Sequence, residues 1–568
     1  MLRKEKIFSS LRPLLIPAAI CAIALAIRII YLNQIKNNPF FIPYKGGLDD
    51  YLYDTWAKEI AFKDLIGKDI FWGLPLYPYF LGAVFFLFGH DLYIARLVQF
   101  AIGAASCSLL FFIGKKIGGT RLGALAALML ALYRPAIFYE GFLSSSFLSI
   151  FLNLLTLLVI VRVNRRPTFM WWLGAGALIG LSGLSSASIF LFMPFLICWM
   201  WTTRKGSGRC AYPLAVIVGT LLMVGSVTVR NYAVGKDFVP ISWHNGLTFY
   251  AGNNPAANGT FSMPPSIGTG VEQAIVNSRT QAEQALGKRL RPSEISSFWF
   301  NEGLAFITHE PGAYVKLTIN KFLLFWNAYE ISDVLDIHLF IKKFAPILQL
   351  PLFTFGIIFP FACLGMLLSF KKRSEPLIAL LYLLIVSHMI SVLLYFVNGR
   401  YRLPIVPYLM IFAAIGLIWT CTRLWKKEFM KLLAFVPLLA GTLFFENIHF
   451  MVTGQESFYN NLGVAYKRKN MLVEAEREYK EALRIRPDYI TPHFNLGILY
   501  QEKGDLQKAE EEFKITLSLN PAQFKAYNKL ADIDLVRGDR HSAFSRLTKS
   551  LAINPRQPDV QELLEHIR

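Results

Sequence analysis

Two adjacent carboxylates, Asp49 and Asp50 in the segment GGLDDYLYDTWA, are the side chains of this sequence best placed to do chemistry. One apolar stretch precedes them and another, LPLYPYFLGAVFFLFG, follows, so they are expected at a membrane surface. A carboxylate there can take a proton from a hydroxyl, while its neighbour orients a substrate, hydrogen-bonds to the base or helps to hold a divalent metal. The structural alternative is a solvated pair, or a cap for a helix that starts near Tyr51.

The composition defines the class of protein that must position these acids. Of 568 residues, 54% are hydrophobic and the mean hydropathy is +0.42, which is typical of a polytopic membrane protein. Apolar stretches long enough to cross about 30 Å of hydrocarbon predict about eleven transmembrane helices. They lie near 11–31, 92–114, 122–139, 142–162, 169–184, 187–203, 211–229, 347–369, 376–397, 404–421 and 431–446. The first is expected to remain as an anchor, and the short stretch 76–88, broken by Pro75 and Pro78, to lie in the interface.

Basic clusters predict the orientation of these spans. They occur at 3–6, 115–121, 162–166, 204–209, 371–373 and 423–427, and all face one side if 76–88 does not cross the membrane. The positive-inside rule then places the N-terminus in the cytoplasm and the loops 32–91 and 230–346 outside the inner membrane. The net charge of +20 favours contact with anionic membrane lipid, and no motif of a nucleic-acid binder occurs.

A repeat with a period of 34 residues follows the last span. Three sets of small residues or prolines align at this period: Gly463, Gly497 and Ala531; Ala475, Ala509 and Ala543; Pro487, Pro521 and Pro555. This is the tetratricopeptide pattern of paired helices. It predicts two domains, a multi-spanning domain over 1–450 and an α-solenoid of three repeats over 456–568 on the external, periplasmic side. Such a solenoid either binds a protein partner in its groove or serves as a stabilising spacer.

Several arginines interrupt the positive-inside trend because they lie at the outer ends of the expected spans: Arg28, Arg96, Arg134, Arg230, Arg400 and Arg402. A single arginine can snorkel toward lipid headgroups, which is the expectation for Arg28 in particular. The other five together favour a binding site for a phosphate, because a guanidinium group makes paired, charge-assisted hydrogen bonds. Lys321, in the second external loop, is a further candidate phosphate ligand.

Carboxylates and arginines on one face predict a type of reaction. Transfer of a sugar from a polyprenyl phosphate needs a base for the acceptor hydroxyl and positive charge for the departing phosphate. Asp49 is the predicted base, and Asp50 orients the acceptor, hydrogen-bonds to the base or helps to hold a metal. Two other classes stay open, namely a lipid-linked sugar flippase or transporter and a non-catalytic scaffold that presents the repeats. The absence of Asp and Glu from the middle of the expected spans disfavours a transporter.

Four other side chains are candidates for substrate binding. Tyr53 and Trp56 follow Asp50 by about one helical turn and either face the same cleft or anchor the helix in the interface. His244 is a candidate general acid, or a metal ligand together with Asp50, although a histidine without a spaced partner is usually neither. Asn253, in the segment GNNP, is expected to shape a turn and only secondarily to contact sugar.

The chain resembles the bacterial glycosyltransferase family 39 group, related to protein O-mannosyltransferases and aminoarabinose transferases, over most of residues 10–420. The segments that carry the resemblance are LDDYLYDTWAKEI, PLYPYFLGAVFFLFG, ARLVQFAIGAASCSLLFFIGKKIGG, RNYAVGKDFVPIS, GLTFYAGNNP and RYRLPIVPYLMIFAAIGL. The resemblance implies the C-type multi-spanning fold and transfer of a hexose or pentose from a polyprenyl-phosphate sugar donor to a protein or glycan acceptor. In that family the first external loop usually carries an Asp-Glu pair whose Asp is essential. Asp49 matches that Asp, whereas Asp50 takes the Glu position and departs from the pattern.

Overall fold

The computed structural model describes residues 2–44, 49–204, 206, 208–264, 267–268, 271–332, 335–433, 435–446 and 454–567. Within these ranges every regular element is a helix, and extended backbone pairs only in an isolated bridge between Tyr133 and Phe353. The prediction of an all-α protein is confirmed.

The chain divides into two compact units. The membrane unit comprises Met1–Lys36, Pro43–Asp333 and Phe340–Phe450. The repeat unit comprises Asn37–Ile42, Val334–Leu339 and Met451–Arg568.

Long apolar helices dominate the membrane unit, and seven helices in the described ranges are long and apolar enough to cross a membrane. They are Leu14–Ile35 of α1 (Leu2–Ile35), α4 (Leu92–Ala131), α6 (Ser146–Arg165), α9 (Gly208–Gly235), α15 (Phe355–Ser369) extended to Lys372, α16 (Pro376–Leu394), and α17 (Gly399–Arg402) continued through Leu403–Ile405 into α18 (Val406–Trp425). The shorter apolar helices are α3 (Leu76–Phe88), α7 (Phe169–Gly183), Ala187–Leu191 with α8 (Phe192–Thr203), and α19 (Phe429–Leu433) with α20 (Val436–Glu446).

Helix α4 covers the expected span 92–114 and the first part of the expected span 122–139. Gly118 and Gly119 have non-helical backbone angles inside it, and φ of Gly119 is +80°, a conformation that favours glycine. This break falls between the expected spans 92–114 and 122–139, so the 40-residue helix is two helices joined at a kink. The chain therefore bends at the predicted boundary between the two expected spans, and the second of these continues past the end of α4 into α5.

Glycine permits a close helix contact between α7 and α9. A Cβ atom on Gly176 would lie 2.1 Å from the carbonyl oxygen of Val216, and one on Gly219 would lie 2.1 Å from that of Leu173. Such approach of two backbones is possible only with small residues, as is common between membrane helices. The bundle continues from α1 through α4 and α6 to α7, while α15 packs on α18.

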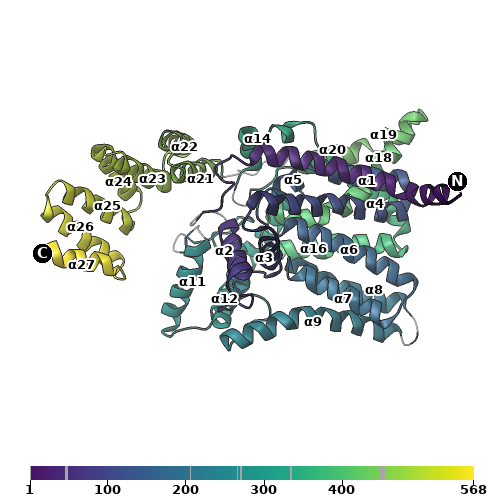
Figure 1. The fold of residues 1–568 in the computed structure, drawn as a ribbon, viewed down its shortest axis with the longest axis horizontal. Helices are drawn as coiled ribbons and strands as arrows, with labels where there is room; N and C mark the ends of the chain where they lie inside the picture. Colours follow the sequence, from purple (N-terminus) through teal and green to yellow (C-terminus); the bar gives the residue numbers. More distant parts are fainter. Residues whose placement is uncertain are drawn as a thin grey trace. The chain divides into compact units, whose positions relative to one another are not determined.

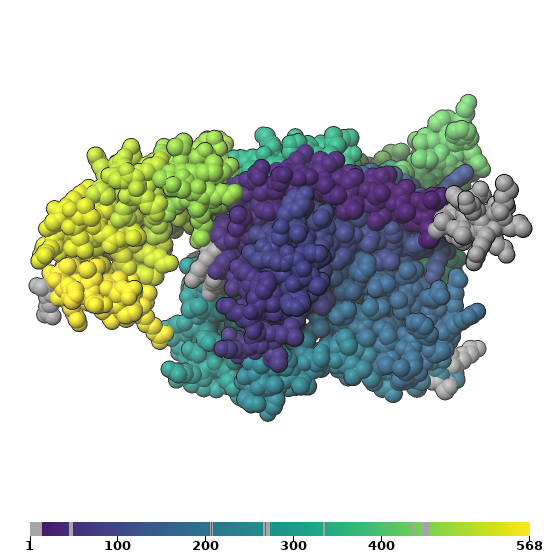
Figure 2. All heavy atoms as spheres, viewed as in Figure 1, coloured from purple at the N-terminus to yellow at the C-terminus, as the bar shows by residue number. Residues whose placement is uncertain are grey.

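Shorter helices gather at one end of this bundle. Figure 1 shows α2 (Asp49–Phe62), α3, α11 (Val271–Leu286) and α12 (Pro292–His309) at the end opposite the N-terminal end of α1. The remaining helices of this unit are α5 (Arg134–Glu140), α10 (Asn245–Gly252), α13 (Pro311–Trp326), the short helix Pro346–Gln349, and α14 (Ile337–Phe344), which begins in the repeat unit. Helix α1 lies on the surface of the unit (Figure 2), where Leu15, Ile23 and Ile30 are exposed.

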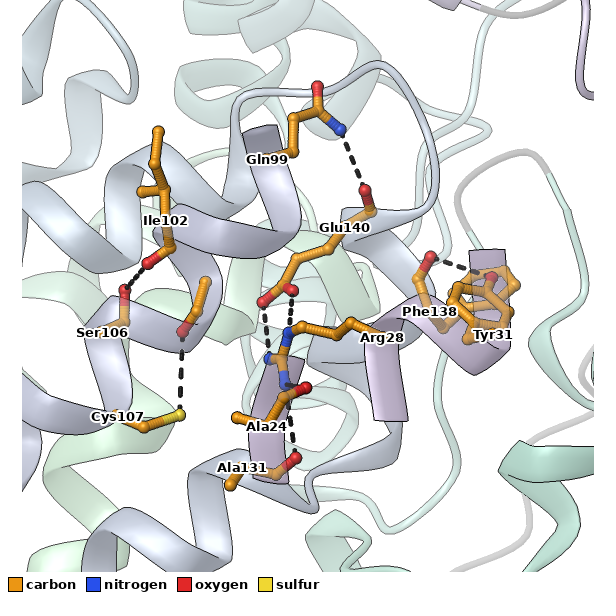
Figure 3. A network of polar contacts seen from close by, with 11 residues as sticks. Ala24, Arg28, Tyr31, Gln99, Ile102, Ser106, Cys107, Ala131, Phe138 and Glu140 are labelled. Carbon is orange, nitrogen blue, oxygen red and sulfur yellow. Dashed lines mark hydrogen bonds and ion pairs between the residues drawn. The ribbon is translucent and has the colours of Figure 1, made fainter. Parts of the chain in front are cut away.

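A buried ion pair corrects the expectation for Arg28. The side chain does not snorkel to the surface: it is fully buried, and its Nε and Nη2 donate to the two carboxylate oxygens of Glu140 at 2.6 and 3.0 Å (Figure 3). Its Nη1 donates to the carbonyl oxygens of Ala24 and Ala131. Glu140 is the last residue of α5 and lies between two expected spans, so it was not counted among the acids inside spans.

The repeat unit is a series of paired helices. They are α21 (Gln455–Arg468), α22 (Leu472–Ile485), α23 (Ile490–Glu502), α24 (Leu506–Leu519), α25 (Phe524–Val536), α26 (Arg540–Ile553) and α27 (Pro558–Ile567). A Cβ on Gly463 would lie 2.5 Å from the Tyr479 ring, and one on Gly497 would lie 2.5 Å from the Phe513 ring. Glycine at these positions of the period therefore lets each pair close.

Candidate active site

Asp49 and Arg400, which are 351 positions apart in the sequence, are in contact in the structure. Asp49 is the first residue of α2, and Arg400 belongs to α17. Both Nη1 and Nη2 of Arg400 approach the same carboxylate oxygen, Oδ2, at 3.4 and 3.3 Å. Charge-assisted pairs are usually about 2.7–2.9 Å long, so this pair is loose. The side chains are 27% and 18% exposed, so a substrate can reach both.

The segment around Arg400 is held by its own sequence. The side chain of Asn398 accepts a hydrogen bond from the backbone N–H of Tyr401 at 2.7 Å and caps α17. The N–H of Gly399 donates to the carbonyl oxygen of Ile331 at 2.8 Å. These bonds fix the short helix against the segment that follows α13, and with it the base of the Arg400 side chain.

Asp50 lies in a different environment from Asp49. Its side chain is buried, with 5% of the residue exposed. Burial raises the pKa of Asp50 to about 7; the charge of Arg96 opposes this shift, and the charges of Asp49 and Asp54 add to it. At neutral pH this carboxyl is therefore partly protonated, and it can donate a hydrogen bond as well as accept one.

Arg96 accompanies the acids but is closed to the surface. It is 1% exposed, its Nε donates to the carbonyl oxygen of Gly141 at 2.8 Å and its Nη1 to that of Leu92 at 3.2 Å. Its charge acts on Asp50. The structure therefore presents Arg96 as a counter-charge for the acids, and not as an open ligand for a lipid phosphate.

Arg402, two residues after Arg400, is also buried, at 3% exposure. Its Nη2 lies 2.8 Å from Oε1 of Glu330, and its Nη1 donates to the carbonyl oxygens of Phe325 and Asn327 at 3.1 and 2.6 Å. The guanidinium also lies 3.7 Å from the centre of the Phe355 ring. These contacts account for its charge within the fold, so Arg400 is the arginine of NGRYRLP that meets the catalytic candidate.

Arg230 and Arg134 also contact backbone carbonyl oxygens. Arg230 donates through Nε to Ile66 at 2.7 Å and through Nη1 to Asp69 at 2.6 Å. Nη2 of Arg134 lies 3.5 Å from the carbonyl oxygen of Leu350. No contact joins either guanidinium group to Asp49 in the described part of the chain, so their assignment as phosphate ligands remains a prediction.

Lys321 and Asn253 are fully buried and bind each other. Nζ of Lys321 donates to Oδ1 of Asn253 at 2.9 Å, and the amide of Asn253 donates to the carbonyl oxygens of Phe249 and Leu394. Burial lowers the pKa of Lys321 to about 7. The pair connects α13 to α10 and α16, and neither side chain is exposed to a substrate in this structure.

The three aromatic candidates have different surroundings. Tyr53 packs edge-on against Tyr77 with ring centres 5.0 Å apart, and Trp56 lies 5.1 Å from Phe71. His244 precedes α10; burial lowers its pKa to about 4, and the charge of Asp49 opposes this shift. The imidazole is therefore neutral at pH 7, and it interacts electrostatically with the candidate base, Asp49.

The possible metal site at Asp50 and His244 lacks a third ligand among the described residues. Among the described residues no three His, Cys, Asp or Glu side chains come together to hold a metal ion, and Asp50 and His244 share no third ligand. The donor set does not fit a bound divalent ion, so no catalytic step is assigned to one.

Asp54 belongs to the same acidic region and was not among the predicted site residues. It is 4% exposed, and its carboxylate oxygens lie 2.6 Å from Nε2 of His90 and 2.8 Å from Nζ of Lys58. The signal was present in the sequence, because Asp54 follows Asp50 by four residues and so lies on the same face of α2.

The fold and the site define a polytopic, all-helical membrane protein with an acid–guanidinium pair and a tetratricopeptide domain. Residues 74–229 match the family model of dolichyl-phosphate-mannose-protein mannosyltransferase, and residues 472–504 and 490–523 match models of the tetratricopeptide repeat. The first match lies within the membrane unit and the other two within the repeat unit, in agreement with the resemblance drawn from the sequence. The match includes Arg96 but neither Asp49 nor Arg400.

Solved structures with some likeness to the chain include ArnT from Cupriavidus metallidurans bound to undecaprenyl phosphate, with 14% identity and a TM-score of 0.43 over 95% of this chain and 79% of that one. The Archaeoglobus fulgidus oligosaccharyltransferase in complex with zinc and sulfate has 15% identity and a TM-score of 0.41 over 75% of this chain. The present chain covers 52% of that oligosaccharyltransferase. No curated protein sequence matches the chain significantly.

Proposed function

We propose that the protein transfers a sugar from a polyprenyl-phosphate carrier to an acceptor hydroxyl at the external face of the inner membrane. The contact between Asp49 and Arg400, at 3.3 Å, is the observation that carries this proposal. It joins a candidate base to a candidate phosphate ligand in a chain whose membrane domain matches a family named for mannose transfer from dolichyl phosphate. The N-terminus is cytoplasmic and the repeats are external in this proposal, as the basic clusters favour.

Asp49 acts as the general base. Its Oδ1 has no hydrogen-bond partner among the described residues, so it can accept the proton of an acceptor hydroxyl. The acceptor oxygen then forms a bond to the anomeric carbon of the sugar while the bond from that carbon to the phosphate oxygen breaks. The proton passes to Asp49, and the polyprenyl monophosphate leaves with the bonding electrons. Inversion at the anomeric carbon is what the family resemblance implies.

Arg400 stabilises the departing phosphate. An ion pair that is partly exposed and longer than 3 Å contributes about 0–1 kcal/mol, so replacing this contact with Asp49 by one with a phosphate costs little. The phosphate gains charge as its bond to the sugar breaks, and a positioned guanidinium then binds it more strongly than in the ground state. The exchange also frees Oδ2 of Asp49 for the acceptor.

Asp50 assists from the buried side. Because its carboxyl is partly protonated at neutral pH, it can donate a hydrogen bond to a neighbouring oxygen, either of the acceptor or of Asp49. Arg96 supplies the positive charge that lets three acids, Asp49, Asp50 and Asp54, occupy one end of α2. Neither role requires a metal ion.

The tetratricopeptide repeats recruit a protein acceptor or an assembly partner in this proposal. Two repeat models match within 472–523, and such repeats build extended surfaces suited to protein binding. If the protein is instead a non-catalytic scaffold, its function should depend on the repeats and not on Asp49. Loss of function on deleting 456–568, with no effect of Asp49→Asn, would favour the scaffold.

The decisive experiment supplies the purified protein with labelled polyprenyl-phosphate sugars and follows the label by mass spectrometry. Asp49→Asn should lower the transfer rate by a factor of about 10²–10⁴, the usual contribution of a positioned base. Asp69→Asn, an exposed acid of the same loop, is the matched control and should leave the rate unchanged. An Asp49→Asn protein that keeps more than one-tenth of the rate would contradict the assignment.

A further inference from the structure

Two neighbouring aromatic rings, one of which lies within range of the charge of Asp49, carry buried nitrogens without a partner among the described residues. Trp72 lies in the loop between α2 and α3, and its ring centre is 4.6 Å from that of His244. The indole Nε1 of Trp72 and Nδ1 of His244 are both buried, and neither has a hydrogen-bond partner among the described residues. Buried polar atoms are nearly always paired, and an unpaired one costs about 1–3 kcal/mol. Two such atoms in adjacent rings indicate a place for a ligand.

The backbone holds the two rings together. The N–H of His244 donates to the carbonyl oxygen of Trp72 at 3.3 Å, and the N–H of Trp243 donates to that of Phe71 at 3.2 Å. These paired bonds join the loop after α2 to the segment before α10. The position of each ring is therefore fixed by the main chain, while its terminal torsion stays soft enough to turn a nitrogen toward a ligand.

The end of α9 reinforces this arrangement. The guanidinium of Arg230 lies 3.8 Å from the centre of the Phe71 ring and bonds the carbonyl oxygens of the same loop. Asn231 accepts a hydrogen bond from the N–H of Phe71 at 3.3 Å, and its amide donates to the carbonyl oxygens of Val239 and Ile241 at 3.0 Å. Arg230 and Asn231 are thus positioning residues for the two rings, which explains a conspicuous arginine at an outer boundary.

The chemistry of the pair selects a neutral, hydroxylated ligand. His244 is uncharged at neutral pH, so each of its ring nitrogens is either a donor or an acceptor, and the indole of Trp72 is a donor. No lysine or arginine forms a hydrogen bond or ion pair with either ring in the described part of the chain, which disfavours a phosphate at this point. Both residues are half-buried, so neither is fully enclosed by the protein. Aromatic surface with a few convergent polar groups is typical of small-molecule sites.

We propose that Trp72 and His244 form the sugar subsite of the transferase, where a sugar ring packs on the indole and its hydroxyls bond Nε1 of Trp72 and Nδ1 of His244. This inference rests on the proposed function, because it assigns the sugar of the proposed transfer to a pair of rings of which His244 is within range of the charge of the candidate base. The sugar belongs either to the lipid-linked donor or to a glycan acceptor, and the chemistry of recognition is the same.

The test compares two lipids that differ only in the sugar. Binding of polyprenyl-phosphate mannose and of bare polyprenyl phosphate is measured on the full-length protein, with Asp49→Asn present to prevent turnover. Trp72→Ala should weaken binding of the mannose lipid about tenfold, and Trp72→Phe, which keeps the aromatic surface, about threefold. His244→Ala should have an effect similar to Trp72→Phe. Trp171→Ala, an exposed tryptophan of α7, is the control.

The outcomes separate the possibilities. Weaker binding of the mannose lipid alone assigns the subsite to the donor sugar. The same ring variants are also made in the protein that keeps Asp49, where turnover can be measured. Unchanged binding of both lipids, with a raised KM for a glycan acceptor in these active variants, assigns the subsite to the acceptor sugar. Equal weakening for both lipids, or no change in any of these measurements, overturns the subsite while the proposed function stands. Failure of the unsubstituted protein to bind either lipid or to transfer sugar overturns both.

Discussion

Replacing Arg400 and Arg402 in turn gives a sharp test, because the structure assigns different roles to two arginines of one short segment. The pair of Arg400 with Asp49 is loose and partly exposed, so its removal should destabilise the fold by no more than about 1 kcal/mol. Loss of the charge that stabilises a departing phosphate should instead lower kcat by about 10²–10³. Arg400→Gln is therefore expected to be folded and nearly inactive.

Arg402 should behave in the opposite way. Its side chain and that of Glu330 are 3% and 6% exposed, and removing one member of a buried pair costs about 3–5 kcal/mol. Arg402→Gln is thus expected to lose folded protein, with a lowered Tm. Whatever folded fraction survives should keep a much larger share of its kcat than Arg400→Gln does.

The assay measures Tm and kcat on the same preparations in detergent. Arg400→Lys serves as an intermediate case, since it keeps the charge but not the two-pronged geometry, and should lose about tenfold in kcat. Two results would refute the reasoning: an Arg400→Gln protein with more than one-tenth of the normal kcat, or an Arg402→Gln protein with normal Tm and no activity.

Three further predictions concern titration and packing. The folded-state pKa of Asp50, about 7, lies above its ordinary 3.8, so between these pH values the folded protein binds more protons than the unfolded chain. Stability should therefore fall as pH rises from about 4 to about 7, and Asp50→Asn should flatten the Tm profile in that window. The pKa of Lys321, about 7, lies below its ordinary 10.5, so stability should rise from pH 7 to about 10; Lys321→Met should abolish that rise, whereas Lys316→Met, an exposed lysine of the same helix, should not. Gly497→Val should make the repeat unit more susceptible to proteolysis, because its Cβ meets the Phe513 ring at 2.5 Å and overpacking costs about 1–3 kcal/mol; Gly441→Val, with open space around the Cβ, is the control.

Most of the architecture could be predicted from the hydrophobic pattern and the repeat period of the sequence. The expected spans correspond to seven long helices and several short ones, and the break at Gly118 and Gly119 separates two spans where the basic cluster 115–121 indicated a loop. The 34-residue period predicted the paired helices of the repeat unit, which the structure contains. These features depend on local composition, which a sequence displays directly.

The partners of the charged residues were harder to foresee. Arg96, Arg230 and Arg402 were grouped with Arg400 because all four lie at outer boundaries, yet the first three bind carbonyl oxygens or Glu330. A backbone carbonyl has no residue-specific signature, so sequence cannot show which arginine it will satisfy. The sequence placed Asp49 and Arg400 on one face of the membrane, and the structure shows that these two side chains are in contact.

The rings of Trp72 and His244 illustrate a second limit. Aromatic residues in an external loop are common anchors of the interface, and nothing in the spacing of positions 72 and 244 distinguishes this pair. Their significance comes from unpaired nitrogens, a property that exists only once the surrounding acceptors are placed in space.

The buried pair of Arg28 and Glu140 also constrains how the chain is made. Arg28 enters the bilayer with the first helix, whereas its carboxylate partner is 112 residues further along the sequence. At a synthesis rate of about 5–20 residues per second, the ribosome needs roughly 6–22 s to supply that partner. During this interval a cation sits among lipid tails without compensation, at a cost of several kcal/mol. We therefore expect insertion of the first helix to require machinery that shelters Arg28 until α5 has been translated.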